Sequence, residues 1–383
     1  MGDIESFIIG LVFGFVTGFF PGLHPNMLIS AMSNFGLDGR TLALIIISLY
    51  PANLISAFIP SIFFGIPDSR TIVAILPGQR MVVEGKGLTA LKIVLFSSIV
   101  TAFLSISFLY LSMDFFVFTY GIIKQHMRWI LLGISILLLL KTKKPHFSLF
   151  VFLLSGLLGR LSFESDMIDP FLPLFSGMFA MAAIVNYRKS KIPEQKEEEI
   201  KFDFLLFVFI GSLLGMLADL IPGVGSPAQV AVFATIFIPM NTLGYLATIS
   251  SISVSQAIFA LATSISIGKS RIGAVVWLAE AINIKENLVF LTCLFIISLS
   301  IAVFGIYLLR KYIAKLSSLD FSKVNIFLAA YLILITVAID GTTGIMILIL
   351  STTLGWLTVK IGVERTNLMG SIILPTLFLL FRI

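Results

Sequence analysis

Residues 220–268, LIPGVGSPAQVAVFATIFIPMNTLGYLATISSISVSQAIFALATSISIG, contain no Asp, Glu, Lys or Arg over 49 positions. Shorter uncharged runs cover residues 6–37, 41–67, 93–113 and 287–309. Of the 383 residues, 58% are hydrophobic and 12% are charged, whereas a soluble domain has about 25% charged residues. Because a helix needs about 20 apolar residues to cross a bilayer, the runs predict an all-α, polytopic integral membrane protein with about ten to twelve transmembrane helices.

One polar segment interrupts the apolar sequence at residues 187–201, which read YRKSKIPEQKEEEIK. This composition predicts a solvated linker between two membrane repeats, residues 1–186 and 202–383. The five basic residues of the segment, together with Lys141, Lys143 and Lys144, indicate that both loops face the cytoplasm. The net charge of +6 is therefore assigned to the orientation of loops in the membrane, and no nucleic-acid partner is expected.

The two repeats are indicated by identities at a constant offset of 201 residues. Ile9, Gly10, Gly14, Pro21 and Gly22 match Ile210, Gly211, Gly215, Pro222 and Gly223, and the same register pairs Thr41-Leu42 with Thr242-Leu243 and Ser69-Arg70 with Ser270-Arg271. Matches at Pro-Gly and Ser-Arg are not exchanges among similar aliphatic residues. The offset predicts two pseudo-symmetric halves, which we expect to be inverted, as in many secondary transporters.

Each half contains a Pro-Gly pair where a membrane helix is expected to break. Proline removes an amide donor and glycine permits unusual dihedral angles, so the two helices should stop there and restart near Asn26 and Ser226. Two re-entrant or broken helices follow, whose free amides and dipoles would bind an anion. A plain proline kink is the structural alternative. The predicted substrate-binding residues at the breaks are Pro21, Gly22, Asn26, Pro222, Gly223, Gly225 and Ser226.

The repeated Ser-Arg pairs, Ser69-Arg70 and Ser270-Arg271, are further candidates for substrate binding. Two guanidinium groups at equivalent positions could bind a dicarboxylate through bidentate hydrogen bonds. The alternative is that both arginines mark loop ends and extend toward lipid headgroups.

Asp219 is the strongest candidate for a coupling-ion ligand, because it is the only charged residue between Asp203 and Lys269. Ionisable residues inside apolar sequence are commonly functional, so Asp219 could bind Na⁺ or carry a proton. The structural alternative is a carboxylate that accepts hydrogen bonds from loop amides. Asp340 and Glu280 are weaker candidates. No other cofactor and no metal site are expected.

These motifs resemble those of the large membrane subunit of the tripartite tricarboxylate transporters. The segment GQRMVVEGKGLTAL is similar to a Gly-x-x-Met-x-x-x-Gly-x-Ala-x-x-Ala-Leu stretch of that family at Gly78, Met81, Gly85, Ala90 and Leu91. Pro222-Gly223-Val224-Gly225 resembles its Pro-Gly-x-Gly break, whereas His24 and Pro25-Asn26 depart from the family pattern. The resemblance implies a carboxylate importer of a prokaryotic cell membrane. It also implies a small membrane subunit and an extracytoplasmic binding protein as partners, with a homodimer as a further possibility.

The combined patterns predict a secondary active transporter for a small organic anion, a di- or tricarboxylate, that works by alternating access with Na⁺ or proton coupling. A translocase of an anionic lipid, such as a polyprenyl phosphate, is the alternative, because paired breaks with arginines would also suit a phosphate. A channel is the third interpretation. An enzyme is not expected, because HExxH, Gly-x-Ser-x-Gly and phosphate-loop motifs are all missing from the sequence.

Overall fold

The fold was analysed in a computed structural model of the chain. The structure describes residues 2–20, 25, 28–29, 32, 35–65, 75–140, 142, 144–186, 193–200, 202–220, 227, 230–231, 234, 240–316 and 321–382. All regular secondary structure in these residues is helical, which confirms the predicted all-α class.

The described helices fall into two groups, before and after the polar segment. Those before the polar segment are α1 (Asp3–Thr17), α3 (Gly39–Ser56), η1 (Pro60–Phe64), α4 (Ile75–Val83), α5 (Gly87–Ser107), α6 (Leu109–Leu140), α7 (Pro145–Phe163), α8 (Phe171–Phe175), η3 (Ser176–Met181) and α9 (Ala182–Val185). Those after it are η4 (Phe202–Phe204), α10 (Leu205–Ala218), α12 (Thr242–Ile267), α13 (Gly273–Ala281), α14 (Leu288–Leu316), α15 (Phe321–Ile361), η5 (Arg365–Met369) and α16 (Gly370–Phe381).

Within the described residues, seven helices are long and apolar enough to cross a membrane. They cover Gly39–Phe64, Gly87–Ser107, Leu109–Leu140, Pro145–Phe163, Thr242–Ile267, Leu288–Lys315 and Asn325–Ile361. Three shorter apolar helices accompany them, at Phe171–Val185, Phe202–Ala218 and Arg365–Phe381. These lengths and this composition confirm a polytopic membrane protein.

The central helices are α3 with its extension η1, and α12. Each of these two segments is 26 residues long, and the most apolar part of each is completely buried. Asp38 caps the first by accepting a hydrogen bond from the amide of Thr41, and Asn241 caps the second by accepting one from the amide of Gly244. Glycines with a positive φ, Gly65 and Gly268, follow their carboxyl ends. The sequence therefore specifies two equivalent buried helices by the same end signals.

The order of helices recurs in the two parts of the chain. The starts of α1, α3, α4 and α5 lie 202, 203, 198 and 201 residues before those of α10, α12, α13 and α14 (3 to 205, 39 to 242, 75 to 273, 87 to 288). Packing recurs as well, because α5 packs against α12 while its counterpart α14 packs against α3. This recurrence agrees with the offset of 201 residues. The boundaries of the two halves and their inversion stay predictions.

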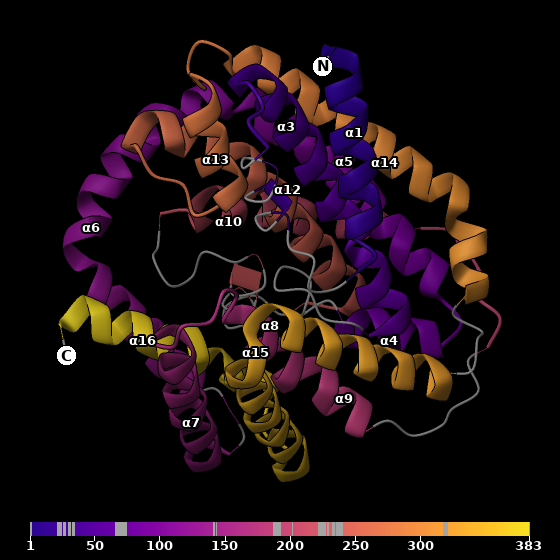
Figure 1. The fold of residues 1–383 in the computed structure, drawn as a ribbon, viewed down its shortest axis with the longest axis vertical. Coiled ribbons are helices and arrows are strands. Elements are labelled where there is room, and N and C mark those ends of the chain that lie inside the picture. Colours follow the sequence, from indigo (N-terminus) through magenta and orange to yellow (C-terminus); the bar gives the residue numbers. More distant parts are fainter. Residues whose placement is uncertain are drawn as a thin grey trace.

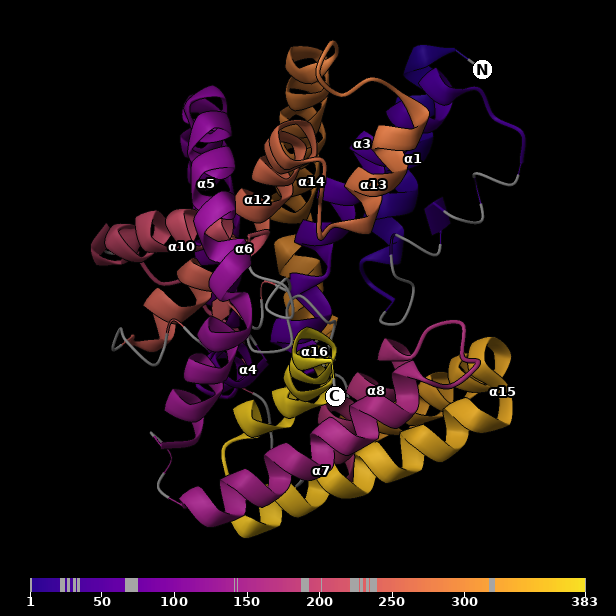
Figure 2. The ribbon, with the colours of Figure 1, turned by 90° about the vertical axis from the view of Figure 1, so that its left-hand side faces the viewer.

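The helices are arranged in two layers, which Figures 1 and 2 show from perpendicular directions. A bundle of α1, α3, α5, α10, α12 and α14 lies above a second layer formed by α7, α8, α9, α15 and α16. In the second layer α7 packs against α16, and α15 packs against η3. Helix α6 contacts α12 in the bundle and α16 in the second layer, so it connects the two. Large apolar side chains on α6 are exposed, as expected of a surface that faces lipid.

The glycines spaced by four residues lie where neighbouring helices are closest. A β-carbon at Gly10 or Gly14 would collide with the backbone of α3 at Ile45 or Leu49. Gly211 and Gly215 are equally close to the backbone and side chains of α12. These Gly-xxx-Gly pairs are therefore positions of close helix packing.

The described part of the polar segment, residues 193–200, is docked onto the turn between α4 and α5. The amide of Lys196 donates to the carbonyl of Gly85 across 2.7 Å, and the amide of Gly87 donates to Gln195 Oε1 across 2.8 Å. Glu197 forms ion pairs with Lys92 and Arg310 at 3.1 and 3.2 Å. The sequence predicts a solvated linker here. The described part is mostly exposed to solvent and also makes these contacts with the protein, and its role as a linker between two repeats stays a prediction.

Candidate functional site

The candidate site is built around Asp219, which follows the last residue of α10. Its side chain is 4% exposed. Helix α10 is short, with 14 residues, so it ends inside the bundle and carries the carboxylate there. A buried carboxylate is stable only when hydrogen-bond donors or a cation surround it, so its contacts define what the site can do.

Two donors come from the buried helix α12. The side-chain amide of Gln256 donates to Asp219 Oδ1 across 2.9 Å, and the hydroxyl of Thr263 donates to Oδ2 across 3.1 Å. Both residues are almost completely buried, at 1% and 0% exposure. The carboxylate therefore connects the end of α10 to two points on α12 that are about two helical turns apart.

Two further donors come from the loop between α12 and α13. The hydroxyl of Ser270 and the amide of Arg271 each donate to Asp219 Oδ2 across 3.4 Å. The loop turns at Gly268, whose φ of 64° is readily adopted only by glycine. The Arg271 side chain is exposed, so its backbone contacts the carboxylate while its guanidinium stays accessible.

The structure brings together three of the residues singled out in the sequence, Asp219, Ser270 and Arg271. The other predicted binding residues lie outside the described residues: Pro21, Gly22, Asn26, Ser69, Arg70, Pro222, Gly223, Gly225 and Ser226. Their roles stay predictions. Asp219 accepts a hydrogen bond from the loop amide of Arg271. This agrees with the structural alternative, in which the carboxylate accepts hydrogen bonds from loop amides.

The equivalent position in the first half is occupied by Gly18, which has no side chain to bind an ion. A β-carbon at Gly18 would collide with Ser56 on α3, so the helices are closer there than at Asp219. Nearby, the side-chain amide of Asn53 donates to the hydroxyl of Thr17 across 3.0 Å. The described polar groups of the first half are therefore neutral at this depth. The carboxylate makes the two halves chemically different.

Sequence reasoning missed Gln256 and Thr263, although both contact Asp219. Their signal is faint, because serine and threonine are frequent throughout α12. Gln256 is the only long polar side chain in that helix, which is an indication that could have identified it.

The groups around Asp219 can serve either as donors or as ligands. A hydroxyl is both donor and acceptor, and a carboxamide can turn its oxygen toward a cation. Rotation of Thr263, Ser270 and Gln256 would convert the four-donor arrangement into a set of oxygen ligands around the carboxylate. Cation binding at Asp219 stays a prediction.

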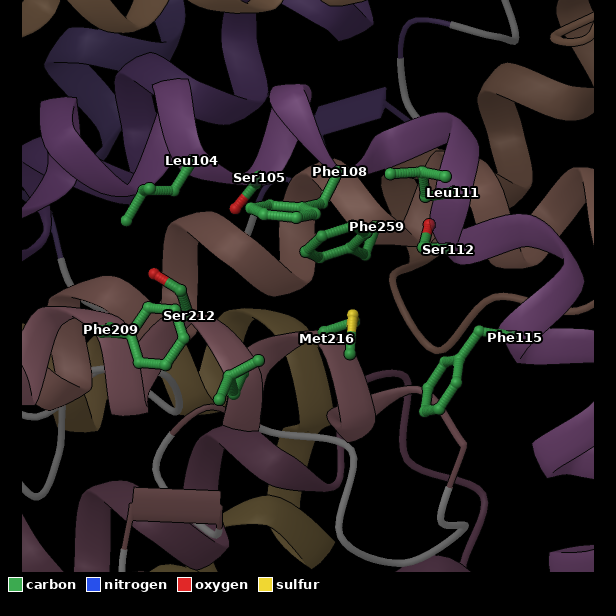
Figure 3. Close-up of a pocket in the computed structure, with 11 residues that line it drawn as sticks. Leu104, Ser105, Phe108, Leu111, Ser112, Phe115, Phe209, Ser212, Met216 and Phe259 are labelled. Carbon is green, nitrogen blue, oxygen red and sulfur yellow. The ribbon is translucent and has the colours of Figure 1, made fainter.

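A separate cavity of about 240 Å³ lies between α5, α6, α10 and α12. Figure 3 shows its aromatic side chains, Phe108, Phe115, Phe209 and Phe259, and the three serines that supply its only side-chain hydroxyls, Ser105, Ser112 and Ser212. The described lining has no charged side chain. Binding a carboxylate there would leave its charge uncompensated, so this cavity is not the candidate anion site.

A family comparison decides the class of protein. Residues 4–203 match the model of the tripartite tricarboxylate transporter TctA family, which is more than half of the chain. The chain belongs to the TctA family. The matched region contains α1 to α9 and the docked polar segment, and it ends before Asp219.

TctA proteins form a family of transporters and not of enzymes, so the chain is a multi-pass membrane component of a tricarboxylate transport system. The description of the family as tripartite implies that other components take part. The chain is also 29% identical to an uncharacterized protein of Methanocaldococcus jannaschii over 409 aligned positions, covering all of both chains. No solved structure matches. None of these matches supports the alternative of a lipid translocase.

Proposed function

We propose that the chain is the permease of a secondary transporter that moves a small organic anion, a di- or tricarboxylate, by alternating access coupled to Na⁺ or protons. Membership of the TctA family supports the substrate class. The observation that carries the coupling is the buried carboxylate of Asp219, held by side chains from α12 and from the loop before α13.

Cation binding at Asp219 would act on the loop through Ser270 and Arg271. In the described state both residues donate to Oδ2, which keeps the loop against the end of α10. A cation at the carboxylate competes with these donors, because they share the same oxygen. The loop would then change its contacts when the cation binds, which links occupancy of Asp219 to the surrounding structure.

The anion would bind next to this carboxylate. Residues 222–226, with the predicted helix break, begin three positions after Asp219 in the sequence, and the exposed guanidinium of Arg271 belongs to a residue that contacts it. A cation at Asp219 removes the negative charge that would repel an anion. Electrostatics therefore favour binding of anion and cation together, which is the basis of symport.

The experiment is uptake of labelled succinate and citrate into proteoliposomes that contain the purified chain, with an imposed Na⁺ gradient, an imposed proton gradient or neither. Uptake of at least one anion should increase with one of the gradients. Because the family is tripartite, thermal unfolding of the detergent-solubilised chain with each anion is measured in parallel. Stabilisation by an anion would support binding even if uptake needs partners.

The matched control for substitutions of Asp219 is Asp203→Asn, which replaces an exposed acid before α10. This substitution removes the same charge at the other end of the same apolar segment and should change neither uptake nor stabilisation. Absence of both uptake and stabilisation for every carboxylate tested would contradict the proposed substrate class.

A further inference from the structure

A second buried carboxylate, that of Asp340, lies in the lower layer at a break in α15. Gly341 has φ 60° and ψ −144°, which is not helical and is readily adopted only by glycine. The element is therefore two arms, residues 321–340 and 342–361, which Figures 1 and 2 show meeting at a sharp angle. Asp340 is the last residue of the first arm.

Asp340 is buried, with 8% exposure, and only one of its two oxygens has a partner. The amide of Asp169, in the loop between α7 and α8, donates to Oδ1 across 2.9 Å. Oδ2 is buried and has no hydrogen-bond partner in the described part of the chain. A buried carboxylate oxygen without a donor is strongly unfavourable when it is ionised, so the site favours uptake of a proton or a cation.

A second unpaired oxygen lies one turn earlier on the same helix face. The hydroxyl of Thr336 is completely buried and has no partner among the described residues. A β-carbon at Gly344 would lie close to Asp340 Cβ and to the methyl carbon of Thr336, so these two side chains border the same space. Each of them also carries a buried oxygen that has no hydrogen-bond partner among the described residues.

The charges around this place are acidic. The loop between α7 and α8 carries Asp166 and Asp169, and Arg160 is paired with Glu164 at 2.8 Å. Neither Asp169 nor Asp340 forms an ion pair within the described residues. Burial, followed by the negative charge of Asp340, raises the pKa of the Asp169 carboxyl above its ordinary value. Two neighbouring carboxylates without a counter-charge favour uptake of a cation.

We propose that Asp340 and Asp169 bind one monovalent cation, Na⁺ or a proton, at the break of α15, with the hydroxyl of Thr336 as a further oxygen ligand. Broken helices place backbone carbonyls where they coordinate such ions in membrane transporters. Within the described residues no group of three or more acidic, histidine or cysteine side chains could hold a metal ion, and a monovalent cation does not need one. Cation binding at the break of α15 does not depend on the proposed transport function. Only a role of this site in coupling rests on that function.

The test is thermal unfolding of the purified full chain in increasing NaCl, with choline chloride keeping the ionic strength constant, over a series of pH values. A Na⁺ site predicts that NaCl raises the Tm of the wild-type protein and that Asp340→Asn and Asp169→Asn lose this rise. Asp166→Asn, which removes an exposed charge from the same loop, should keep it.

A proton site predicts a different pattern in the same data. The wild-type Tm is then insensitive to NaCl and falls as the pH rises, because the shared proton leaves. Asp340→Asn, which resembles the protonated acid, should not show this fall. If Asp340→Asn responded to both NaCl and pH as Asp166→Asn does, the proposal would be wrong.

One further variant keeps the test decisive. Thr336→Val leaves the carboxylates in place and should weaken the apparent affinity for the cation by about tenfold, so it replaces Asp340→Asn if that variant does not fold. Repeating the series in the Asp219→Asn background separates the two sites. An intact response there, with unchanged gradient stimulation of transport, would refute the coupling role of Asp219 and leave the α15 site standing.

Discussion

Gln256 donates its side-chain amide to Asp219 across 2.9 Å, and both residues are buried in the centre of the bundle. This contact joins the end of the short helix α10 to the middle of α12, one of the two central buried helices. The carboxylate is held from α12 on one side and from the loop before α13 on the other. A change in the charge of Asp219 therefore acts on two elements at once.

Thr263→Val should weaken cation coupling while leaving the fold intact. Valine has nearly the same shape but cannot donate to Asp219 or bind a cation. We expect the Na⁺ or proton concentration for half-maximal uptake to rise about tenfold. Thr248→Val is the matched control, because Thr248 is equally buried on α12 but its hydroxyl contacts the carbonyl of Phe207. Equal effects of the two substitutions would show that Thr263 acts only through packing.

Gly14→Ala should destabilise the protein without changing its substrate. The added β-carbon would meet the backbone of Leu49, which cannot move without shifting α3. We expect the free energy of unfolding to fall by about 1 to 3 kcal/mol, with a lower yield of folded protein. In Gly133→Ala the β-carbon would have no neighbour within 4 Å, so this variant should be unchanged or slightly more stable.

Much of the fold follows from the sequence. Uncharged runs coincide with the central helices α3 and α12 and with much of α5 and α14, and Asp38, Asn241 and Gly268 mark helix ends by known capping rules. The contact of Asp219 with Ser270 could not be predicted, because it depends on where α10 ends relative to a loop 51 positions later. The docking of residues 193–200 was missed because glutamates and lysines in a row resemble a solvated loop until their partners, such as Arg310, are known.

The docked polar segment should be released by acid. Burial raises the pKa of the Glu197 carboxyl, but hydrogen bonds from Lys92 and Arg310 together lower it more, so its pKa lies below the ordinary 4.5. Its contribution to docking is therefore present above pH 4.5 and is lost as the pH falls through the lowered pKa. Hydrogen exchange of residues 193–200, expressed relative to the intrinsic rate at each pH, should increase at that acidic pH.

Glu197→Gln should give the same increase at neutral pH. Each exposed ion pair is weak, so we expect local exchange to change and global unfolding to stay constant. Glu194→Gln, at an exposed position in the same segment, is the control and should exchange as the wild-type protein does. Identical exchange in all three proteins would show that the ion pairs do not hold the segment.

Gly223→Ala should abolish transport if the anion binds at the second Pro-Gly break. A β-carbon there would restrict the backbone and crowd the ligand, an expectation that rests on the sequence because residue 223 lies outside the described residues. Thermal unfolding with citrate or succinate separates loss of binding from loss of folding. Normal folding with wild-type affinity in both Gly223→Ala and Asn26→Ala would place the anion elsewhere.

The most direct test of the central claim is uptake of labelled carboxylate by proteoliposomes containing wild-type protein, Asp219→Asn or Asp203→Asn, each with and without the stimulating gradient. Coupling through Asp219 predicts that the gradient stimulates the wild-type protein and Asp203→Asn, whereas Asp219→Asn folds normally and is no longer stimulated. Equal stimulation of all three proteins by the Na⁺ or proton gradient would contradict it.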